Sequence, residues 1–456
     1  MINRPNNMFL FSQTSGSGAF EPDAEWLALE QKLRERALLI DPDIQWLAAL
    51  AATRGLANSQ WARNKIRLIL EGEQIEDMRT ENAFRPPAPA AMLSQGQLHL
   101  FHQADGLAWL IPLTALTRGV FLTGPQGSGK SRLLVYLCWQ LSRLGIPYTV
   151  IDPKEGLKAW ADYINARYYD ISAWSLDFKP PAGTLYETFL PALMPQLADI
   201  IGVVYGTEIL QQAASICIEL RNRYVQQTGT NTEISLQDIY QALPLVSEVS
   251  KGRRYGYREA VSTGLSRILT GSGELFKCRK GVDLSILLNQ NNVLGCADLT
   301  DEFATRWLPV YLLEWVSFES RNRAPTDAPK RVFIFDDASR YLAARGAFER
   351  QGSTSSLTHL LAKLRSTGNC TLFTTQIPHM SDAGVLALSH TVVCVGGLQY
   401  GPDTKILAEM MGLSPEQRIA LSRLRKRQAV GICGSCQWTR PVHGYTVDVP
   451  DRGEQR

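Results

Sequence analysis

Apolar residues recur along the chain with two different periods, and the change between them divides the sequence. Over residues 21–80 the spacing is helical. Asp41-Pro42 matches a helix N-cap followed by a proline at the first helical position, and a further helix is predicted from Ser59 to Gly72. The pattern therefore predicts a small helical domain. Its first helix places four residues on one face: Trp26, Leu29, Leu33 and Ala37.

From residue 97 the period changes to two, which predicts a hairpin. Short apolar runs then alternate with helical stretches such as Glu302 to Ser320. Strands that are apolar throughout and alternate with helices are typical of a parallel sheet covered on both faces. The predicted buried strands lie in "GVFLTG", "GIPYTVIDPKEG", "NNVLGCADL", "RVFIFDD", "CTLFTTQ" and "TVVCVGG".

Leucine-spaced segments fill residues 185–275, which is more helix than one crossover between strands requires. We therefore expect an all-helical insertion in an α/β domain. The predicted organisation is a flexible tail (1–20), an N-terminal helical domain (21–83), a proline-rich linker (84–96), an α/β domain in two pieces (97–184 and 276–450) around the insertion (185–275), and a tail (451–456).

Composition narrows the class of protein without naming a function. The chain has 456 residues, 45% hydrophobic and 20% charged, so it has the composition of a globular protein of several domains. A net charge of +3 means that any nucleic-acid binding must come from local patches. No window approaches an apolar membrane span and the start lacks a signal pattern, so we expect a cytoplasmic protein with eight reduced cysteines.

The stretch "GVFLTGPQGSGKSRLL" carries the strongest chemical signal. Gly124, Gly129, Lys130 and Ser131 satisfy the P-loop pattern, with an apolar strand before them and a leucine-rich helix after them. Glycines allow backbone N–H groups to surround phosphates, and the helix N-terminus favours the same anions. The pattern predicts an ATP site; the alternative is a glycine turn that binds nothing. The predicted nucleotide-binding residues are Gly124, Pro125, Gln126, Gly127, Ser128, Gly129, Lys130, Ser131 and Arg132.

A phosphate site of this kind also needs a carboxylate near its Mg²⁺, and "RVFIFDDASRYL" places two after a buried strand. Paired acids at a strand tip are costly unless a cation compensates them. We expect Ser131 and Asp336 to serve Mg²⁺, Lys130 to neutralise phosphate charge, and Asp337 to polarise the attacking water. A carboxylate directly after the metal ligand favours an ATPase over a small-molecule kinase. The alternative is a solvated acidic turn.

Gln376 ends the apolar strand of "CTLFTTQIPHM". An amide at the tip of a strand lying between the two phosphate-site strands can sense the γ-phosphate or orient water. Taken alone, Gln376 is equally compatible with an ordinary polar residue in a loop. Its place after the other two motifs favours the catalytic interpretation.

With these residues in place the chain resembles the HerA/FtsK superfamily of ring-forming motor ATPases, and most of all the type IV secretion coupling proteins of the TraD/TraG class. The matching segments are "GPQGSGKS", "VIDPKEG" (the family has "DPKGE"), "FIFDD", "KLRSTGNCTLFTTQ" and the late "RPV". The resemblance covers residues 97–450 and implies a RecA-like fold with a mainly parallel sheet.

The resemblance further implies a homo-hexameric DNA motor for conjugation, in which an arginine eleven residues before the sensor glutamine reaches the neighbour's ATP. Here that position is Arg365. The alternative role for Arg365 is that of a helix-end arginine that faces solvent. Two departures stand out. Asp337 replaces the family's usual glutamate, and the amino-terminal transmembrane helices of coupling proteins are missing.

Basic segments provide candidates for DNA contact. "KGRRYGYR" interleaves cations with tyrosines, which suits backbone contact and base stacking, although a solvated basic turn has the same composition. "RGAFERQGSTSS" (345–356) is a second candidate loop. "RLRKRQ" (423–428) is expected to cap a helix at the surface, and Cys433 and Cys436 to lie at a hairpin tip without metal. The named DNA candidates are Lys251, Arg253, Arg254 and Tyr255.

Three functions are compatible with these residues. The leading hypothesis is an ATP-driven DNA translocase, acting on single- or double-stranded DNA as a homo-oligomeric ring. A nucleotide-gated scaffold with weak hydrolysis that recruits a nuclease or relaxase is the second. A motor that moves protein substrates is the third. The helical regions would choose the partner, which in the first reading could include secretion components.

Overall fold

The computed structural model describes residues 24–447 and 449, apart from 37, 54–56, 86, 172–174, 177, 247–252, 280 and 342–355. The chain divides into two compact units, one ending at Arg79 and the other beginning at Thr80. The division falls inside a helix, four residues before the domain end expected at residue 83.

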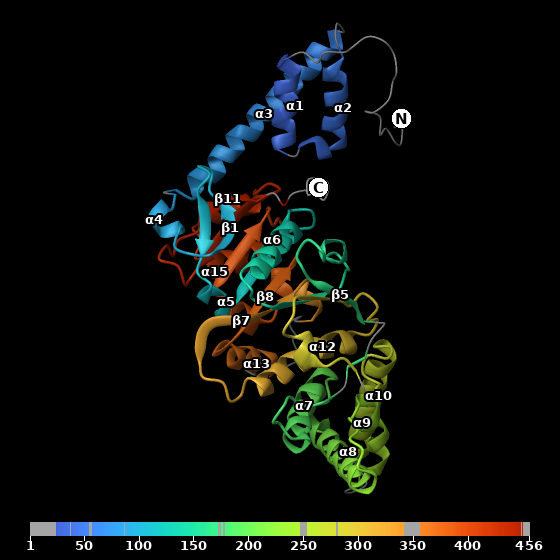
Figure 1. Cartoon of the computed structure of the whole chain (residues 1–456). Helices are drawn as coiled ribbons and strands as arrows, with labels where there is room; N and C mark the ends of the chain where they lie inside the picture. Colours follow the sequence, from blue (N-terminus) through green and yellow to red (C-terminus); the bar gives the residue numbers. More distant parts are fainter. Residues whose placement is uncertain are drawn as a thin grey trace. The chain divides into compact units, whose positions relative to one another are not determined.

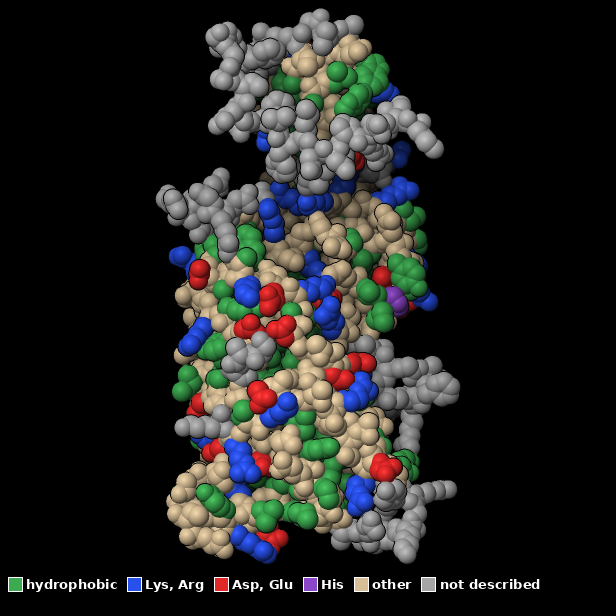
Figure 2. Space-filling view, turned by 90° about the vertical axis from the view of Figure 1, so that its right-hand side faces the viewer, with side chains coloured by type: hydrophobic (Ala, Val, Ile, Leu, Met, Phe, Trp, Pro, Cys, Tyr) green, Lys and Arg blue, Asp and Glu red, His purple; other side chains and the backbone are tan. Residues whose placement is uncertain are grey.

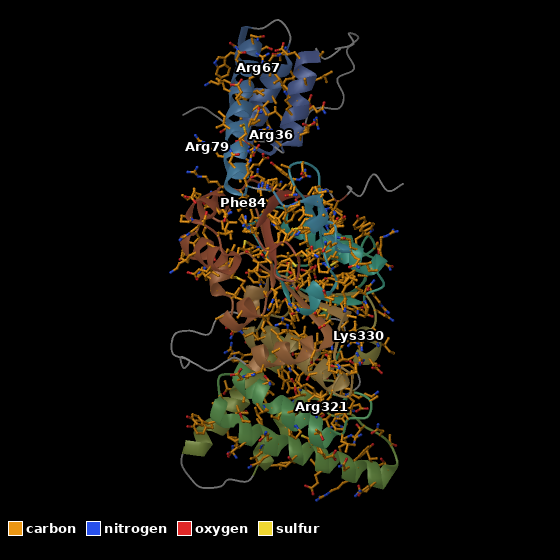
Figure 3. The ribbon with its side chains drawn as sticks, turned by 90° about the vertical axis from the view of Figure 1, so that its left-hand side faces the viewer. Arg36, Arg67, Arg79, Phe84, Arg321 and Lys330 are labelled. Carbon is orange, nitrogen blue, oxygen red and sulfur yellow. The ribbon has the colours of Figure 1, made fainter. Side chains whose placement is uncertain are left out.

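The smaller unit is built from helices around one apolar core. Trp26, Leu29 and Leu33 are buried together, as the helical spacing predicts, while Ala37 lies outside the described residues. Arg36, labelled in Figure 3, pairs with Asp77 at 3.4 Å and ties the end of the first helix to the third. The helices are α1 (Ala24–Glu35), α2 (Pro42–Ala52) and α3 (Ala57–Ala83).

The start of the second helix was predicted correctly from the sequence, and the end of the third helix was not. The Asp41 carboxylate accepts a hydrogen bond from Asp43 N at 2.8 Å, which confirms the predicted N-cap with Pro42 at the first helical position. The prediction that the third helix stops at Gly72 is wrong, because α3 continues to Ala83. A single glycine costs a helix only about 1 kcal/mol relative to alanine, which a helix this long tolerates.

The larger unit contains a mixed sheet (Figure 1). Over the described residues it has eleven strands in the order β2-β1-β11-β10-β9-β3-β8-β7-β4-β6-β5. From β9 to β5 neighbouring strands are parallel, while β10, β11, β1 and β2 add an antiparallel end. The strands are β1 (Leu98–His102), β2 (Ala108–Ile111), β3 (Val120–Thr123), β4 (Tyr148–Asp152), β5 (Arg167–Asp170), β6 (Asn292–Gly295), β7 (Thr326–Phe335), β8 (Thr367–Thr375), β9 (Thr391–Val395), β10 (Gln428–Cys433) and β11 (Val442–Thr446).

Helices cover both faces of this sheet, and the predicted α/β class with a mainly parallel sheet is confirmed. Along β3, Phe121 joins one apolar cluster while Val120 and Leu122 join the other, as expected for a strand buried on both sides. The helices of this unit are α4 (Ala90–Leu93), α5 (Thr114–Thr117), α6 (Lys130–Arg143), α7 (Tyr186–Ile200), α8 (Thr207–Thr228), α9 (Leu236–Ala242), α10 (Arg253–Gly271), α11 (Leu284–Leu287), α12 (Glu302–Glu319), α13 (Ser356–Arg365), α14 (Ala383–Ala387), α15 (Gly401–Met411) and α16 (Pro415–Ser422).

The segment 185–275 forms the helices α7 to α10. They gather at the end of the larger unit remote from β1 and β11, beyond α12 (Figure 1). Helix α12 is buried along most of its length and contacts both α7 and α10. Its core side chains Trp307 and Tyr311 share one cluster with the insertion and with Phe335 of β7. The insertion is therefore packed on the sheet through α12.

Residues 84–96, expected to be a linker, pack closely against the sheet. Phe84, labelled in Figure 3, stacks on His443 of β11 with ring centroids 5.6 Å apart, and the side-chain amide of Gln103 exchanges two hydrogen bonds with the backbone of Ala88. Because proline fixes backbone angles without preventing burial, a proline-rich composition does not distinguish a spacer from a packed strap. Among the described helices, none has both the length and the hydropathy that crossing a bilayer requires.

Two buried histidines make the larger unit sensitive to acid. Burial lowers the pKa of His443 to about 4, and burial together with the neighbouring His102 lowers that of His99 to about 4. Both folded-state values lie below the unfolded value, so the unfolded chain gains protons first as the pH falls. This stabilising contribution is present above about pH 6.5 and is lost as the pH falls toward 4.

We expect the midpoint temperature of unfolding to fall between pH 7.5 and 5.5, and His443→Phe, which keeps the stacking with Phe84, to reduce the slope. The contribution of one such histidine approaches about 1.4 kcal/mol per pH unit below the unfolded pKa. Thermal unfolding followed by circular dichroism at several pH values measures it. His359→Gln, at an exposed position on α13, is the control. An unchanged slope in His443→Phe would contradict the assignment.

Candidate nucleotide site

The glycine-rich loop lies between β3 and α6, with its residues at the carboxyl end of the parallel strands. A Cβ on Gly124 would lie 2.1 Å from the carbonyl oxygen of Val395, so no larger residue fits. Gly129 caps α6 with φ of 107°, a conformation that other residues rarely adopt. The glycines thus allow the loop to turn tightly against β9 and to begin α6 with its first N–H groups directed into the loop.

Buried polar groups in and beside the loop fit an anion. The hydroxyls of Thr123 and Ser128 are buried and make no hydrogen bond within the described part of the chain. Lys130 is only 6% exposed, and burial lowers the pKa of its ammonium group, while Asp336 and Asp337 act in the opposite direction. A buried cation at a helix N-terminus is suited to phosphate. Of the remaining predicted nucleotide-binding residues, Pro125 is half-buried and Gln126, Gly127, Ser131 and Arg132 are exposed.

The acidic pair lies at the end of β7, where Asp336 and Asp337 follow Phe335. Asp337 takes the left-handed backbone conformation with φ of 51°. Thr374 of β8 holds both residues: its hydroxyl donates to Asp336 Oδ1 and accepts from Asp337 N at 3.1 Å. The sequence analysis did not single out Thr374, because only the pairing of β7 with β8 places it there.

Each aspartate faces a lysine. Lys130 interacts electrostatically with both carboxylates, and Lys154 Nζ lies 2.7 Å from Asp337 Oδ2. Lys154 belongs to "VIDPKEG" (150–156), whose first three residues end β4, the strand next to β7. In the same segment Glu155 has φ of 53°, at the position where the family pattern has glycine. From the sequence this segment was predicted to be a strand end and a family marker, and Lys154 was given no role.

Gln376 follows β8, and β8 lies between β3 and β7 in the sheet. The predicted placement between the two phosphate-site strands is therefore confirmed. The side chain is half-buried. Parallel strands end at one edge, so the loop after β3, the acidic tip of β7 and Gln376 all belong to the same edge of the sheet. This arrangement can bind a phosphate chain at the glycine loop. It can also direct the acidic pair and Gln376 to the end of that chain.

Arg365 lies at the opposite edge, at the end of α13 just before β8. Since β8 runs from Thr367 to Thr375 at ~3.3 Å per residue, about 30 Å separates Arg365 from Gln376. Its Nε donates to the carbonyl of Thr117 at 3.1 Å. Burial and the neighbouring Arg118 both lower the pKa of Arg365. The pKa of His390 is lowered by burial and also by these two arginines. Within one chain Arg365 is remote from the glycine loop, and Arg118 is a neighbouring cation that the sequence motifs did not reveal.

The basic segment 423–428, which was expected to cap a helix at the surface, also reaches the glycine loop through Arg427. Arg427 N donates to the carbonyl of Ser128 at 3.0 Å, and Arg427 has φ of 73°. Its Cγ lies 3.9 Å from the position of a Cβ on Gly129. Arg423 caps α16, as predicted, and the turn before β10 additionally brings Arg427 to the loop.

Other predicted features lie partly beyond the described residues. Lys251 is outside them, as is the loop 345–355, and of Arg253, Arg254 and Tyr255 only the backbone is described, in the first turn of α10. Cys433 ends β10 and Cys436 lies in the turn after it, and both are free cysteines. Over the described residues no cluster of three or more His, Cys, Asp or Glu side chains is arranged for a metal ion.

Comparison with known proteins supports the fold. No family model and no curated protein matches the chain. VirB4 of Thermoanaerobacter pseudethanolicus matches with a TM-score of 0.59 and 14% identity, over 78% of this chain and 98% of that one. The plasmid coupling protein TrwB matches in complex with the ATP analogue ADPNP (TM-score 0.56) and with ADP and Mg²⁺ (0.55), each at 14% identity over 80% of this chain and 93% of that one. The chain thus has the P-loop ATPase fold of these proteins, and the predicted structural resemblance to coupling proteins is confirmed.

Thr374 provides a test of the acidic strand tip. Thr374→Val keeps the shape of the side chain but removes the donor to Asp336 and leaves the buried N–H of Asp337 without an acceptor. We expect the free energy of unfolding to fall by about 1–3 kcal/mol. Thr374→Ser, which keeps the hydroxyl, should lose less. Chemical denaturation of the three proteins measures the difference, and equal stability of Thr374→Val and wild type would exclude this role for the hydroxyl.

Proposed function

We propose that this chain is an ATP-driven DNA translocase that works as a homo-oligomeric ring, with a hexamer as the expected assembly. The observation that carries the proposal is the meeting of Lys130, the Asp336–Asp337 pair and the strand ending at Gln376 at one edge of the sheet. Three separate segments supply the groups that phosphoryl transfer to water requires.

The proposed roles follow from position. The loop amides and Lys130 hold the β- and γ-phosphates, while Ser131 and Asp336 serve Mg²⁺. The bound ion neutralises charge on the phosphate oxygens. Asp337 orients and polarises the attacking water, and Gln376 contacts the γ-phosphate or that water. TrwB, which shares the fold, has been observed with an ATP analogue and with ADP and Mg²⁺, and this supports the choice of ligands.

Arg365 gives a physical reason for a ring. One chain places it about 30 Å along β8 from Gln376, so it does not meet its own phosphates. A neighbouring copy, related by rotation, can bring that edge to the nucleotide. We assign Arg365 the role of an arginine finger, assisted by Arg118. The remaining guanidinium nitrogens of Arg365 would contact the γ-phosphate.

DNA binding is the part of the proposal that rests most on local charge. On the face shown in Figure 2, Lys and Arg side chains of the larger unit are interspersed with Asp and Glu side chains. With a net charge of +3, contact must come from concentrated loops repeated around a ring. We propose Lys251, Arg253, Arg254 and Tyr255 for this role, and assign the helical insertion and the N-terminal unit to partner choice.

A scaffold that binds ATP but hydrolyses it slowly is the second candidate. It is favoured by the shorter side chain of Asp337 and by the ion pair that already engages Asp337 Oδ2. Such a protein would recruit a nuclease or relaxase when nucleotide is bound. A motor for protein substrates would respond to a protein partner and not to DNA.

Phosphate release with and without DNA distinguishes these functions. We expect single- or double-stranded DNA to stimulate ATP hydrolysis, and Lys130→Ala to lower the rate about a hundred-fold or more through loss of phosphate charge stabilisation. Arg143→Ala, at the far end of α6, is the matched control and should behave as wild type. Tight ATP binding without DNA-stimulated turnover would favour the scaffold, and failure to bind ATP would refute both.

Mixed rings test the placement of Arg365. Arg365→Ala and Lys130→Ala should each be nearly inactive, with a loss of about 10³ to 10⁵ for an arginine finger. Mixed in equal amounts, about one interface in four combines an intact Lys130 with an intact Arg365 from the neighbour. We therefore expect partial recovery of ATPase activity. Native mass spectrometry checks assembly, and no recovery in correctly assembled rings would contradict action across the interface.

A further inference from the structure

The segment after β4 is held by a buried carboxylate. Asp152 is fully buried, and its two oxygens accept N–H groups from Lys154 at 3.1 Å and from Leu157 at 2.7 Å. Burial raises the pKa of Asp152, and these two N–H groups oppose the rise. The backbone of Lys154 is therefore fixed, and only its side chain remains free to turn.

The Lys154 side chain pairs with one carboxylate oxygen of Asp337 and leaves the other oxygen with only a distant partner. Lys154 Nζ lies 2.7 Å from Asp337 Oδ2, and Arg340 Nε lies 3.6 Å from the same oxygen. The other oxygen, Oδ1, has the Ser339 hydroxyl as a distant donor at 3.4 Å. The Asp337 side chain is 12% exposed and that of Lys154 is 41% exposed, so the pair is shielded from solvent on the aspartate side only. A carboxylate anchored through one oxygen can offer the other to water.

We propose that Lys154 is a positioning residue that holds Asp337 Oδ2, so that Oδ1 faces the attacking water. The inference rests on the proposed function and deepens it. An aspartate carries its carboxylate closer to the backbone than a glutamate would, so its orientation matters more. A misplacement of about 1 Å at such a group can cost a hundred-fold in rate. The ammonium group also supplies a charge for Asp337 that leaves Lys130 for the phosphates.

The experiment compares Lys154→Met, which keeps the length and removes the charge, with Lys154→Arg, which keeps the charge. For Lys154→Met we expect kcat to fall about ten- to a hundred-fold, with Kd for ADPNP within about two-fold of wild type. Lys154→Arg should retain kcat within about three-fold. Lys158→Met is the matched control, because Lys158 follows in the same stretch of chain but pairs with Glu155 and lies over the ring of Tyr168 of β5.

A double variant separates positioning from direct phosphate contact. If Lys154 acts through Asp337, adding Lys154→Met to Asp337→Asn causes no further loss of kcat. Additive losses, or a loss of ADPNP affinity as large as the loss of kcat, would show contact with the phosphate itself and overturn the proposal. Wild-type kcat in Lys154→Met would overturn it as well.

Failure of the proposed function has a different signature. If the wild type hydrolyses no ATP, the enzyme assignment is wrong, and binding of Mg·ADP with aluminium fluoride, a mimic of the transferring phosphoryl group, decides the role of Lys154. Weaker binding of that mimic by Lys154→Met, with unchanged binding of ADP, supports the positioning role. Equal binding of the mimic by both proteins overturns it.

Discussion

The opposition of buried cations and paired carboxylates at one edge of the sheet is the constraint on which the rest of the site depends. Lys130 is nearly inaccessible, and an isolated buried ammonium group is costly. Asp336 and Asp337 make its burial possible, and Lys154 in turn balances Asp337. In the proposed function, a phosphate chain with its metal ion fits among these charges because Lys130 matches its anionic oxygens and Asp336 matches its cation.

The order of strands converts this charge arrangement into a site. β8 separates β3 from β7, so Thr374 can bind both aspartates while Gln376 follows at the strand end. Parallel strands also separate the two edges. The glycine loop lies at one edge and Arg365 with Arg118 and His390 at the other. In the proposed ring this separation is useful, because it allows one copy to sense the nucleotide of the next.

Residues outside the motifs complete the environment. Arg427 contacts the glycine loop through its backbone, although the local sequence resembles an ordinary basic helix end. Asp152 fixes the backbone at Lys154. Asp152 is buried because of its position at the end of β4, and the sequence motif alone does not indicate this burial. The turn before β10 thus contacts the glycine loop, and Thr446 of β11 donates its N–H to the carbonyl of Arg427 in that turn.

Local signals in the sequence determined the glycine loop, the acidic strand tip, the apolar parallel strands and the helical insertion. Each depends on the properties of a few consecutive residues: glycine's freedom at positive φ, the alternation of apolar runs with helices, and the cost of adjacent acids. Only the tertiary structure decided that Thr374, Lys154 and Arg427 join that site and that Arg365 lies away from it. Those relations depend on which strands pair and on how turns return to the sheet, and the order of residues along the chain does not encode such distances directly.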